Sequence, residues 1–442
     1  MTNIKRTLWF YLALMVLIIV VGMVMGAPFT LRLLVEAFAL SLIALGLNIQ
    51  WGYGGLFNFG VMGFIMVGGF AVSFISVPVN MDFWNSDGPV LLLRAIAAAG
   101  IGALLIMGAN RLKDMGATQN WSRTAKIAAW IIAYLIYRSQ IDPAARYIEA
   151  EAEYVGGLGL PVIVGWAFGG LLGGIIAYMI GKIALGLRTD YLAIATIGIS
   201  EIIRAFIKNM DWLTRGTLTI TPLPWPVPRP QEFQAWGVDS AASFIFARAG
   251  YLALIVVVVL GVLFLIQRAY GGPWGRMMRA IRDNHISAAS MGKDVKARQL
   301  EIFIFGSVLI SIGGAILISF VQIFDPAAFQ PINHTFIIWV MVIVGGAGNN
   351  YGVLFGGIFI YTIWIISEPV SQLLFFNLSN LSERIGWGVI PEIESRSLQM
   401  RVFVLGLVIT FALRYAPNGL IPEVIHRDKE ESQPQKGSVK EA

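Results

Sequence analysis

The sequence predicts an all-α fold, a polytopic transmembrane helical bundle of about 10–12 spanning segments with broken helices. It is 57% hydrophobic and 13% charged over 442 residues, with a mean hydropathy of +0.72. A soluble chain is roughly a quarter charged, and long apolar runs are what a hydrocarbon layer about 30 Å thick requires. The runs are continuous, as in Leu252 to Leu265, which excludes the alternating strands of a transmembrane barrel.

Twelve apolar runs supply the expected helices. They are residues 8–25, 33–49, 56–77, 90–109, 127–137, 162–185, 191–207, 251–266, 302–323, 336–344, 353–366 and 402–413. The runs that begin at Ile127, Phe336 and Val402 are short for a complete crossing. The first run follows Lys5 and Arg6 and is longer than the core of a usual signal peptide, so we expect an anchor.

The distribution of charge sets the expected topology. If all twelve runs cross, residues 111–126, with four basic side chains, lie inside and the acidic stretch 149–153 lies outside. The basic loop 270–299 and both termini then also lie inside, as the positive-inside rule favours. Ten spans with two half-helices fit nearly as well. Alternate prolines between Pro222 and Pro230 predict that residues 211–247 form an external surface loop.

Several classes of site are excluded or disfavoured. Cysteine is absent, and His285, His334 and His426 are scattered in loops and the tail, so we expect no metal and no catalytic residues. The chain has no phosphate-binding loop, and its GGAGNNYG stretch lacks the glycine spacing of a dinucleotide site. Most basic residues occupy short loops and no nucleic-acid motif accompanies them, so we expect no nucleic-acid partner.

Glycine-rich interruptions occur near both ends of the chain, at residues 48–58 and 345–352. Unwound backbone at membrane depth must be buried in protein or line a wet cavity, which makes their asparagines candidates for a translocation pathway. These candidates are Asn48, Asn58, Asn349 and Asn350. Tight interfacial turns between hairpin helices remain an equal alternative.

A second pathway candidate is the pair Glu201 and Arg204. Three residues apart, these side chains share a helix face, where they could line a route for a zwitterion. A structural ion pair or a wet interfacial helix is the alternative. The glycines from Gly169 to Gly174 instead indicate close helix packing.

The basic loop is predicted to hold an amphipathic helix from Gly275 to Gly292. Such a helix could lie on anionic lipid headgroups. Its small residues between Ala280 and Gly292 also allow close approach to a protein cleft.

Five stretches together resemble the permease subunit of ATP-binding-cassette importers of the branched-chain amino acid class, a family that includes urea permeases. They are LIALGLNIQWGYGGLFNFG, LRTDYLAIATIGISEIIRAF, GRMMRAIRDNHISAASMGKDVKARQLEIFIFG with VGGAGNNYGVLFGG, and RYAPNGLI. The resemblance implies a transmembrane permease domain at 1–421 with a coupling loop at 270–299, followed by a disordered cytoplasmic tail at 422–442. The poorly matching region at about 89–159 is expected to be an insertion with an extra helical pair.

The resemblance also implies partners and a docking helix. The partners would be a sister permease, two cytoplasmic ATPase subunits and a periplasmic binding protein. The chain itself would lie in the lipid of the bacterial inner membrane. It would bind no cofactor, since the ATPase subunits use the ATP. The expected ATPase-coupling residues are Arg276, Arg279, Ile281, Asn284, Ala288 and Gly292. The family's acidic residue before the small pair is replaced by Ile286, so that contact is not carried over.

Three alternatives stay open. One is a urea or amide permease of the same class. Another is an ion-coupled secondary transporter, for which Glu36, Asp190 and Glu201 are the plausible carboxylates in the first half. The remote one is a membrane-embedded enzyme, which would require a convergent His, Asp or Ser site.

Overall fold

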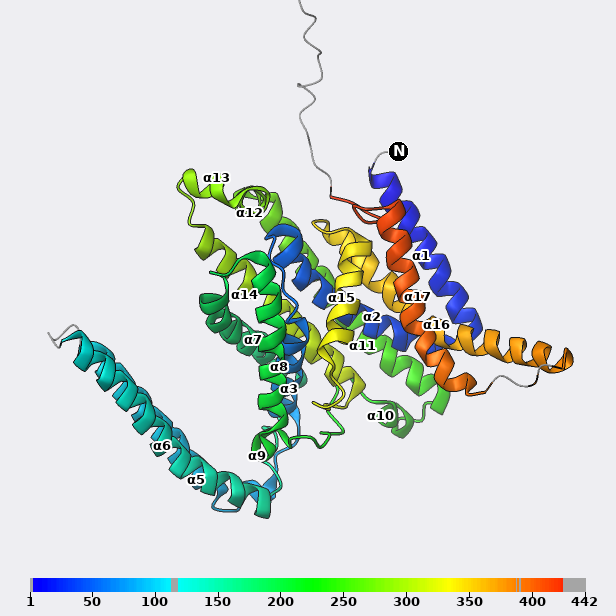
Figure 1. The fold of residues 1–442 in the computed structure, drawn as a ribbon. Coiled ribbons are helices and arrows are strands. Elements are labelled where there is room, and N and C mark those ends of the chain that lie inside the picture. The colour runs from blue at the N-terminus through cyan, green and yellow to red at the C-terminus, as the bar shows by residue number, and fades with distance from the viewer. Residues whose placement is uncertain (1–2, 113–117, 387, 389–390, 424–442) are drawn as a thin grey trace, which may run out of the picture.

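The computed structural model describes residues 3–112, 118–386, 388 and 391–423, and its named elements are all helices (Figure 1). The long helices are α1 (Asn3–Met25), α2 (Ala27–Asn48), α3 (Val61–Ser76), α5 (Gly88–Arg111), α6 (Gln119–Glu151), α7 (Val162–Ala184), α8 (Thr189–Lys208), α11 (Ser240–Gly271), α14 (Val295–Val321), α15 (Pro331–Gly345), α16 (Asn350–Arg384) and α17 (Ile393–Tyr415). The short ones are the π-helix η1 (Ile49–Tyr53), α4 (Met81–Trp84), α9 (Asp211–Thr214), α10 (Pro230–Ala235), α12 (Pro273–Asp283) and α13 (His285–Ser290). The predicted tail lies outside the described residues from position 424 onward.

The predicted polytopic helical bundle is confirmed. Among the described residues, 8 helices are long and apolar enough to cross a membrane, and α3 and α15 supply shorter apolar helices. The helix at Val402 is longer than expected, because α17 begins at Ile393, with polar and charged residues before the apolar run, and spans 23 residues. The run that begins at Leu56 instead forms a shorter helix, since α3 starts only at Val61.

Helix α2 forms the centre of the bundle. Of its most apolar window, 78% is buried inside the protein, against 11% for α1 and α17. It packs against α14, α16, α11 and α15. The α2–α14 contact is close because Gly46 faces Gly306, where an added Cβ would lie 2.6 Å from the Gly306 carbonyl oxygen. Small residues of this kind let membrane helices approach backbone to backbone.

The predicted packing role of the glycines in α7 is confirmed. A Cβ on Gly173 would lie 2.1 Å from the Ser311 hydroxyl, and one on Gly170 would lie 2.9 Å from Ile312, both on α14. Helices α3, α7 and α14 therefore form one tightly packed group beside α2.

The region at about 89–159 forms the helical hairpin α5–α6. The two helices pack against each other and against the short helices α4 and α9, and the hairpin leans away from the bundle (Figure 1). Large apolar side chains such as Leu93, Leu104 and Trp130 are exposed on it. In a membrane, this surface is suited to lipid or to another apolar protein surface.

The two ends of the bundle carry different elements. The amino-terminal end of α1, helices α12 and α13, and the segment up to Glu423 lie at one end, while α9 and α10 lie at the other (Figure 1). The proline-rich segment is a surface loop, as predicted, although α11 already begins at Ser240. It is fixed to the loop after α14 by two backbone hydrogen bonds of 3.0 Å between Ile220 and Phe324.

We expect Gly68→Ala to destabilise the protein. A Cβ at this position would lie 1.9 Å from the Ser311 carbonyl oxygen, and overpacking of this kind costs about 1–3 kcal/mol. Thermal unfolding in detergent, followed by tryptophan fluorescence, would measure the loss. Gly261→Ala in α11 is the matched control, because its Cβ would meet no atom within 4 Å. Equal melting temperatures for the two variants would contradict this packing.

Candidate functional site

The glycine-rich interruption after α2 is a buried break in the helix. After α2 the chain forms the π-helix η1 at Ile49–Tyr53. It then continues without regular structure to Gly60, and α3 begins at Val61. Leu56, Asn58 and Gly60 are buried along this stretch. Backbone polar groups buried in this way must be paired within the protein.

Asn58 pairs one of these backbone groups, and Gln50 connects Asn58 to the core. Asn58 donates to the Gln50 side chain at 2.8 Å and accepts from the Gly60 N–H at 2.8 Å. Gln50 in turn donates to the Phe303 carbonyl at 2.9 Å and the Ser307 hydroxyl at 3.0 Å on α14. Both side chains are fully buried, so the break is anchored to the core.

Asn48 joins this break to the second interruption. Its Nδ2 donates to Asn350 Oδ1 at 2.9 Å, and its Oδ1 accepts from the Gly348 N–H at 2.9 Å. The two interruptions, 302 residues apart at Asn48 and Asn350, are thus in direct contact. Gly52 makes this possible, because a Cβ there would lie 2.1 Å from Asn48 Oδ1 and 2.6 Å from the Gly348 nitrogen.

The second interruption is the turn between α15 and α16, and the end of the described chain packs on it. Gly346 and Gly348 adopt positive φ values of 116° and 82°, which favour glycine. Asn349 caps α16 by accepting from the Tyr351 N–H at 3.1 Å, and it donates to the Ile421 and Pro422 carbonyls at 3.2 Å each. The closing RYAPNGLI stretch therefore completes this turn.

The basic loop folds into two helices, where the sequence predicted one. Helix α12 ends at Asp283, and α13 begins at His285 after Asn284, whose φ of −156° and ψ of 97° are extended. Asn284 Oδ1 accepts from the N–H groups of Ile286 and Ser287, at 3.1 and 3.0 Å. This capping interaction starts a new helix, so the single helix from Gly275 to Gly292 is corrected to a bent pair.

The two helices bury their apolar face against the bundle. Ile281 and Ala288, expected to dock, are 3% and 7% exposed, together with the buried Met278. The exposed positions among the expected docking residues are Arg276, Asn284 and Gly292. Ile286 and Met291, which the sequence reasoning did not assign to docking, are 69% and 80% exposed. In the sequence, Ile286 is recognisable as an apolar residue out of phase with the buried Ile281 and Ala288.

Arg282 lies where α12 meets the break. Its guanidinium donates to the Gly52 carbonyl at 2.6 Å, to Glu423 at 2.9 Å and to Asp283 at 3.1 Å. Partial burial works to lower the pKa of Arg282, but the Glu423 and Asp283 carboxylates outweigh it and raise that pKa. Arg282 therefore stays charged at this junction.

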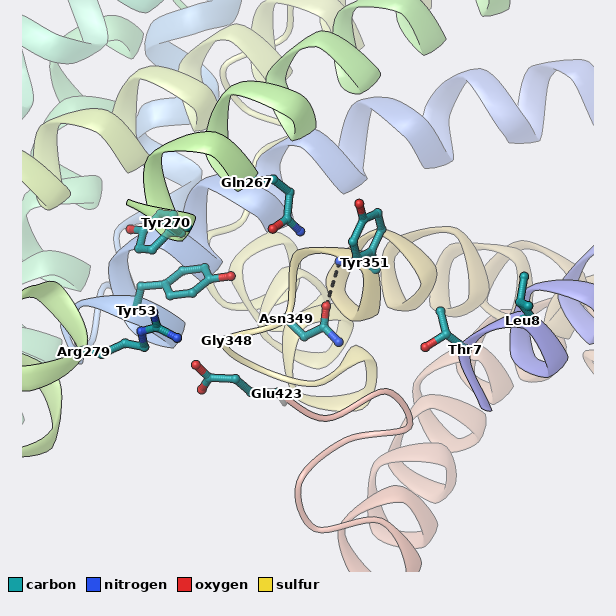
Figure 2. Close-up of a pocket in the computed structure, with 11 residues that line it drawn as sticks. Thr7, Leu8, Tyr53, Gln267, Tyr270, Arg279, Gly348, Asn349, Tyr351 and Glu423 are labelled. Carbon is teal, nitrogen blue, oxygen red and sulfur yellow. Dashed lines mark hydrogen bonds between the residues drawn. The ribbon is translucent and has the colours of Figure 1, made fainter. Parts of the chain in front are cut away.

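A cavity of about 500 Å³ opens beside the junction. Its polar lining comes from six separate segments and includes Tyr53, Gln267, Arg279, Asn349 and Glu423. The side chains of Tyr53 and Gln267 extend into this space, and Arg279 lies near Glu423 (Figure 2). Arg279, an expected docking residue, is half-buried in the cavity wall.

Comparison with known proteins decides the family. The family described as branched-chain amino acid transport system / permease component matches residues 29–413. The chain belongs to this family. A relative from Methanocaldococcus jannaschii, named "Probable branched-chain amino acid transport permease protein LivM", is 23% identical over 86% of this chain and 90% of its own length. The high-affinity LivM permeases of Escherichia coli and Salmonella typhimurium are 28% and 27% identical, over 43% of this chain and 47% of theirs. No solved structure matches.

The permease carries the predicted Glu201–Arg204 pair on the outside of α8. The two charged groups are 3.5 Å apart, with side chains 49% and 24% exposed. Arg204 also donates to the Ala327 carbonyl at 3.4 Å. Large apolar neighbours on the helix, such as Ile194 and Phe206, are exposed as well. This strip of charged and apolar side chains on α8 is separate from the place where Asn48 and Asn350 join the two interruptions.

A second charged group of the permease is buried at the other end of α2. Glu36 is 6% exposed, accepts from Arg32 at 2.9 Å and also accepts from the Tyr361 hydroxyl. It borders a cavity of about 320 Å³ that also contacts Glu368 and Arg401, which pair with each other. The pairing compensates these charges within the membrane-spanning helices.

We expect Asn48→Leu to destabilise the permease. The substitution removes the partner of the Gly348 N–H and of Asn350, and each buried group left unpaired costs about 1–3 kcal/mol. Detergent melting temperature is the measurement, with Asn377→Ala on the exposed face of α16 as control. If both variants melt like the parent protein, Asn48 does not hold the two interruptions together.

Proposed function

We propose that this chain is the membrane permease subunit of an ATP-binding-cassette importer that carries branched-chain amino acids. The observation that supports this most is the bent helix pair α12–α13, which presents exposed apolar residues and contacts the break after α2 in a member of this permease family. ATP hydrolysis in partner subunits would displace α12–α13. The bundle would then alternate between two access states that the partners bind with different affinity.

The proposed partners each have a place on the chain. The assembly would contain two ATPase subunits, and one of them would dock at α12–α13 of this chain. The exposed residues that would contact it are Ile286, Met291, Arg276, Asn284 and Gly292. A sister permease would complete the pathway along the outer face of α8, where Glu201 and Arg204 would meet a zwitterionic substrate. The asparagines of the two interruptions would not contact an open channel. They would control opening of the pathway through the buried hydrogen bonds that join the interruptions, and they are Asn48, Asn58, Asn349 and Asn350. A periplasmic binding protein would deliver the substrate to the α9–α10 end.

The proposed orientation follows from charge. The α12 end carries Arg276, Arg279 and the basic amino-terminal residues Lys5 and Arg6. The positive-inside rule therefore places this end, with both termini, in the cytoplasm of a bacterial inner membrane. ATP would be bound by the partners, and this chain would need no cofactor of its own.

We expect uptake to depend on ATP. The assay uses proteoliposomes that contain this chain, the sister permease, both ATPases and the binding protein. They should accumulate labelled leucine when ATP is present on the side of the membrane that carries the ATPases. Uptake should persist when ionophores collapse the ion gradients. Competition by unlabelled isoleucine but not urea is expected for the amino-acid substrate. Loss of uptake on gradient collapse, with ATP still present, would instead identify an ion-coupled carrier.

We expect Ile286→Asp to weaken ATPase binding. A carboxylate at this 69% exposed position would be desolvated in an apolar contact, with a cost of about 1–3 kcal/mol and a corresponding loss of co-purified ATPase. Leu218→Asp, a 61% exposed position in the loop before α10, is the matched control. Equal recovery of the ATPases with both variants would show that α13 is not the docking surface.

A further inference from the structure

The hydrogen bonds at the α12 end form a closed ring of four segments. Arg282 on α12 bonds the Gly52 carbonyl at 2.6 Å, and Asn48, one turn before Gly52, bonds Gly348 and Asn350. Asn349, within the same turn, bonds the Ile421 and Pro422 carbonyls at 3.2 Å each. One residue later, Glu423 accepts from Arg282 at 2.9 Å and closes the ring.

The ring is closely packed on three of its sides. Gly52 and the Gly348 nitrogen are so close that a Cβ would not fit between them, and the Ile421 carbonyl lies equally close to Gly346 and Gly352. Backbone hydrogen bonds of 2.8 Å from Leu420 to Val344 and 3.1 Å from Ile421 to Gly345 fix residues 420–421 to α15. The break after α2, the α15–α16 turn and residues 420–423 are therefore one packed unit.

The fourth side of the ring is formed by the side chain of Arg282 on α12. It joins α12 to that unit through a backbone carbonyl at the end of η1 and the side-chain carboxylate of Glu423. The side chains of Arg282 and Glu423 are 22% and 16% exposed, so their attraction is less screened than that of a surface pair. A guanidinium can hold both acceptors at once in a fixed planar arrangement, which the ammonium of lysine does not reproduce.

We propose that Arg282 is the positioning residue through which displacement of α12 reaches the break after α2 and the α15–α16 turn, and that Glu423 holds it in place. The inference deepens the proposed function and depends on it, because the displacement of α12 is attributed to the partner ATPases. Motion of α12 would pull on the Gly52 carbonyl, and the ring would carry that motion to Asn48 and to the α15–α16 turn as one body. Without Arg282, the ATPases would hydrolyse ATP while the break after α2 stayed where it is.

The test is the number of ATP molecules hydrolysed per leucine imported by the reconstituted complex. With Arg282→Gln, we expect normal co-purification of the ATPases and ATP hydrolysis close to that of the parent complex. Uptake should fall about tenfold, so that the ratio rises by about the same factor. Arg282→Lys should recover only part of the loss. Arg268→Gln, an exposed arginine in the last turn of α11, is the matched control and should leave the ratio unchanged.

A double-mutant cycle tests the part assigned to Glu423. Glu423→Gln alone should raise the ratio by less than Arg282→Gln, because the bond from Arg282 to Gly52 remains. The double variant should be no worse than Arg282→Gln, since the two residues act through one contact. Additive effects would overturn the role of Glu423.

The outcomes separate the two proposals. If the parent complex shows no ATP-driven uptake, the proposed function fails before any variant is compared. If the parent complex is ATP-driven but Arg282→Gln leaves the ratio unchanged, the inference about Arg282 alone fails. A parallel fall of hydrolysis and uptake, with or without loss of bound ATPase, also overturns it, because a purely structural or docking role predicts that result.

Discussion

The rest of this structure depends on one constraint, that a broken helix inside a membrane protein must find every hydrogen-bond partner within the protein. Between Asn48 and Gly60 the chain leaves the regular α-helix while remaining buried. Side chains from α8, α15 and α12 pair with backbone groups of this stretch, at Phe59, Asn58 and Gly52. The position of α2 at the centre of the bundle follows, because only a central helix has partners on all sides.

The sequence predicts the framework of this arrangement well. Long apolar runs, glycine-rich interruptions and a basic loop are local features, so periodicity and composition are sufficient to place them. The hydrogen bond between Asn48 and Asn350 was beyond that reasoning, because nothing local to either residue identifies a partner 302 positions away. Both asparagines were selected as polar groups within a break, and their burial became visible only with the tertiary structure.

The basic loop illustrates where a periodic pattern misleads. Arginines at helical spacing predict an amphipathic helix but do not say which surface its apolar face meets. In the structure that face packs on the permease itself, so Ile281 and Ala288 are buried while Ile286 is exposed. The direction changes at Asn284, whose side chain competes with the backbone as a cap, a role that is common for asparagine but not specific enough to predict.

The contacts between the first break and residues 348–423 also have a consequence for biogenesis. Residues 48–58 are synthesised early, yet Gly348, Asn350 and the carbonyls of residues 421 and 422 emerge near the end of translation. Most of the protein must therefore be inserted before the joint can close. Until then, Asn48 stays without its final partners and has to remain in water, in the insertion machinery or beside a chaperone. In a chain released early, Asn48 would stay unpaired at the centre of the bundle, and membrane quality control could recognise this polar group.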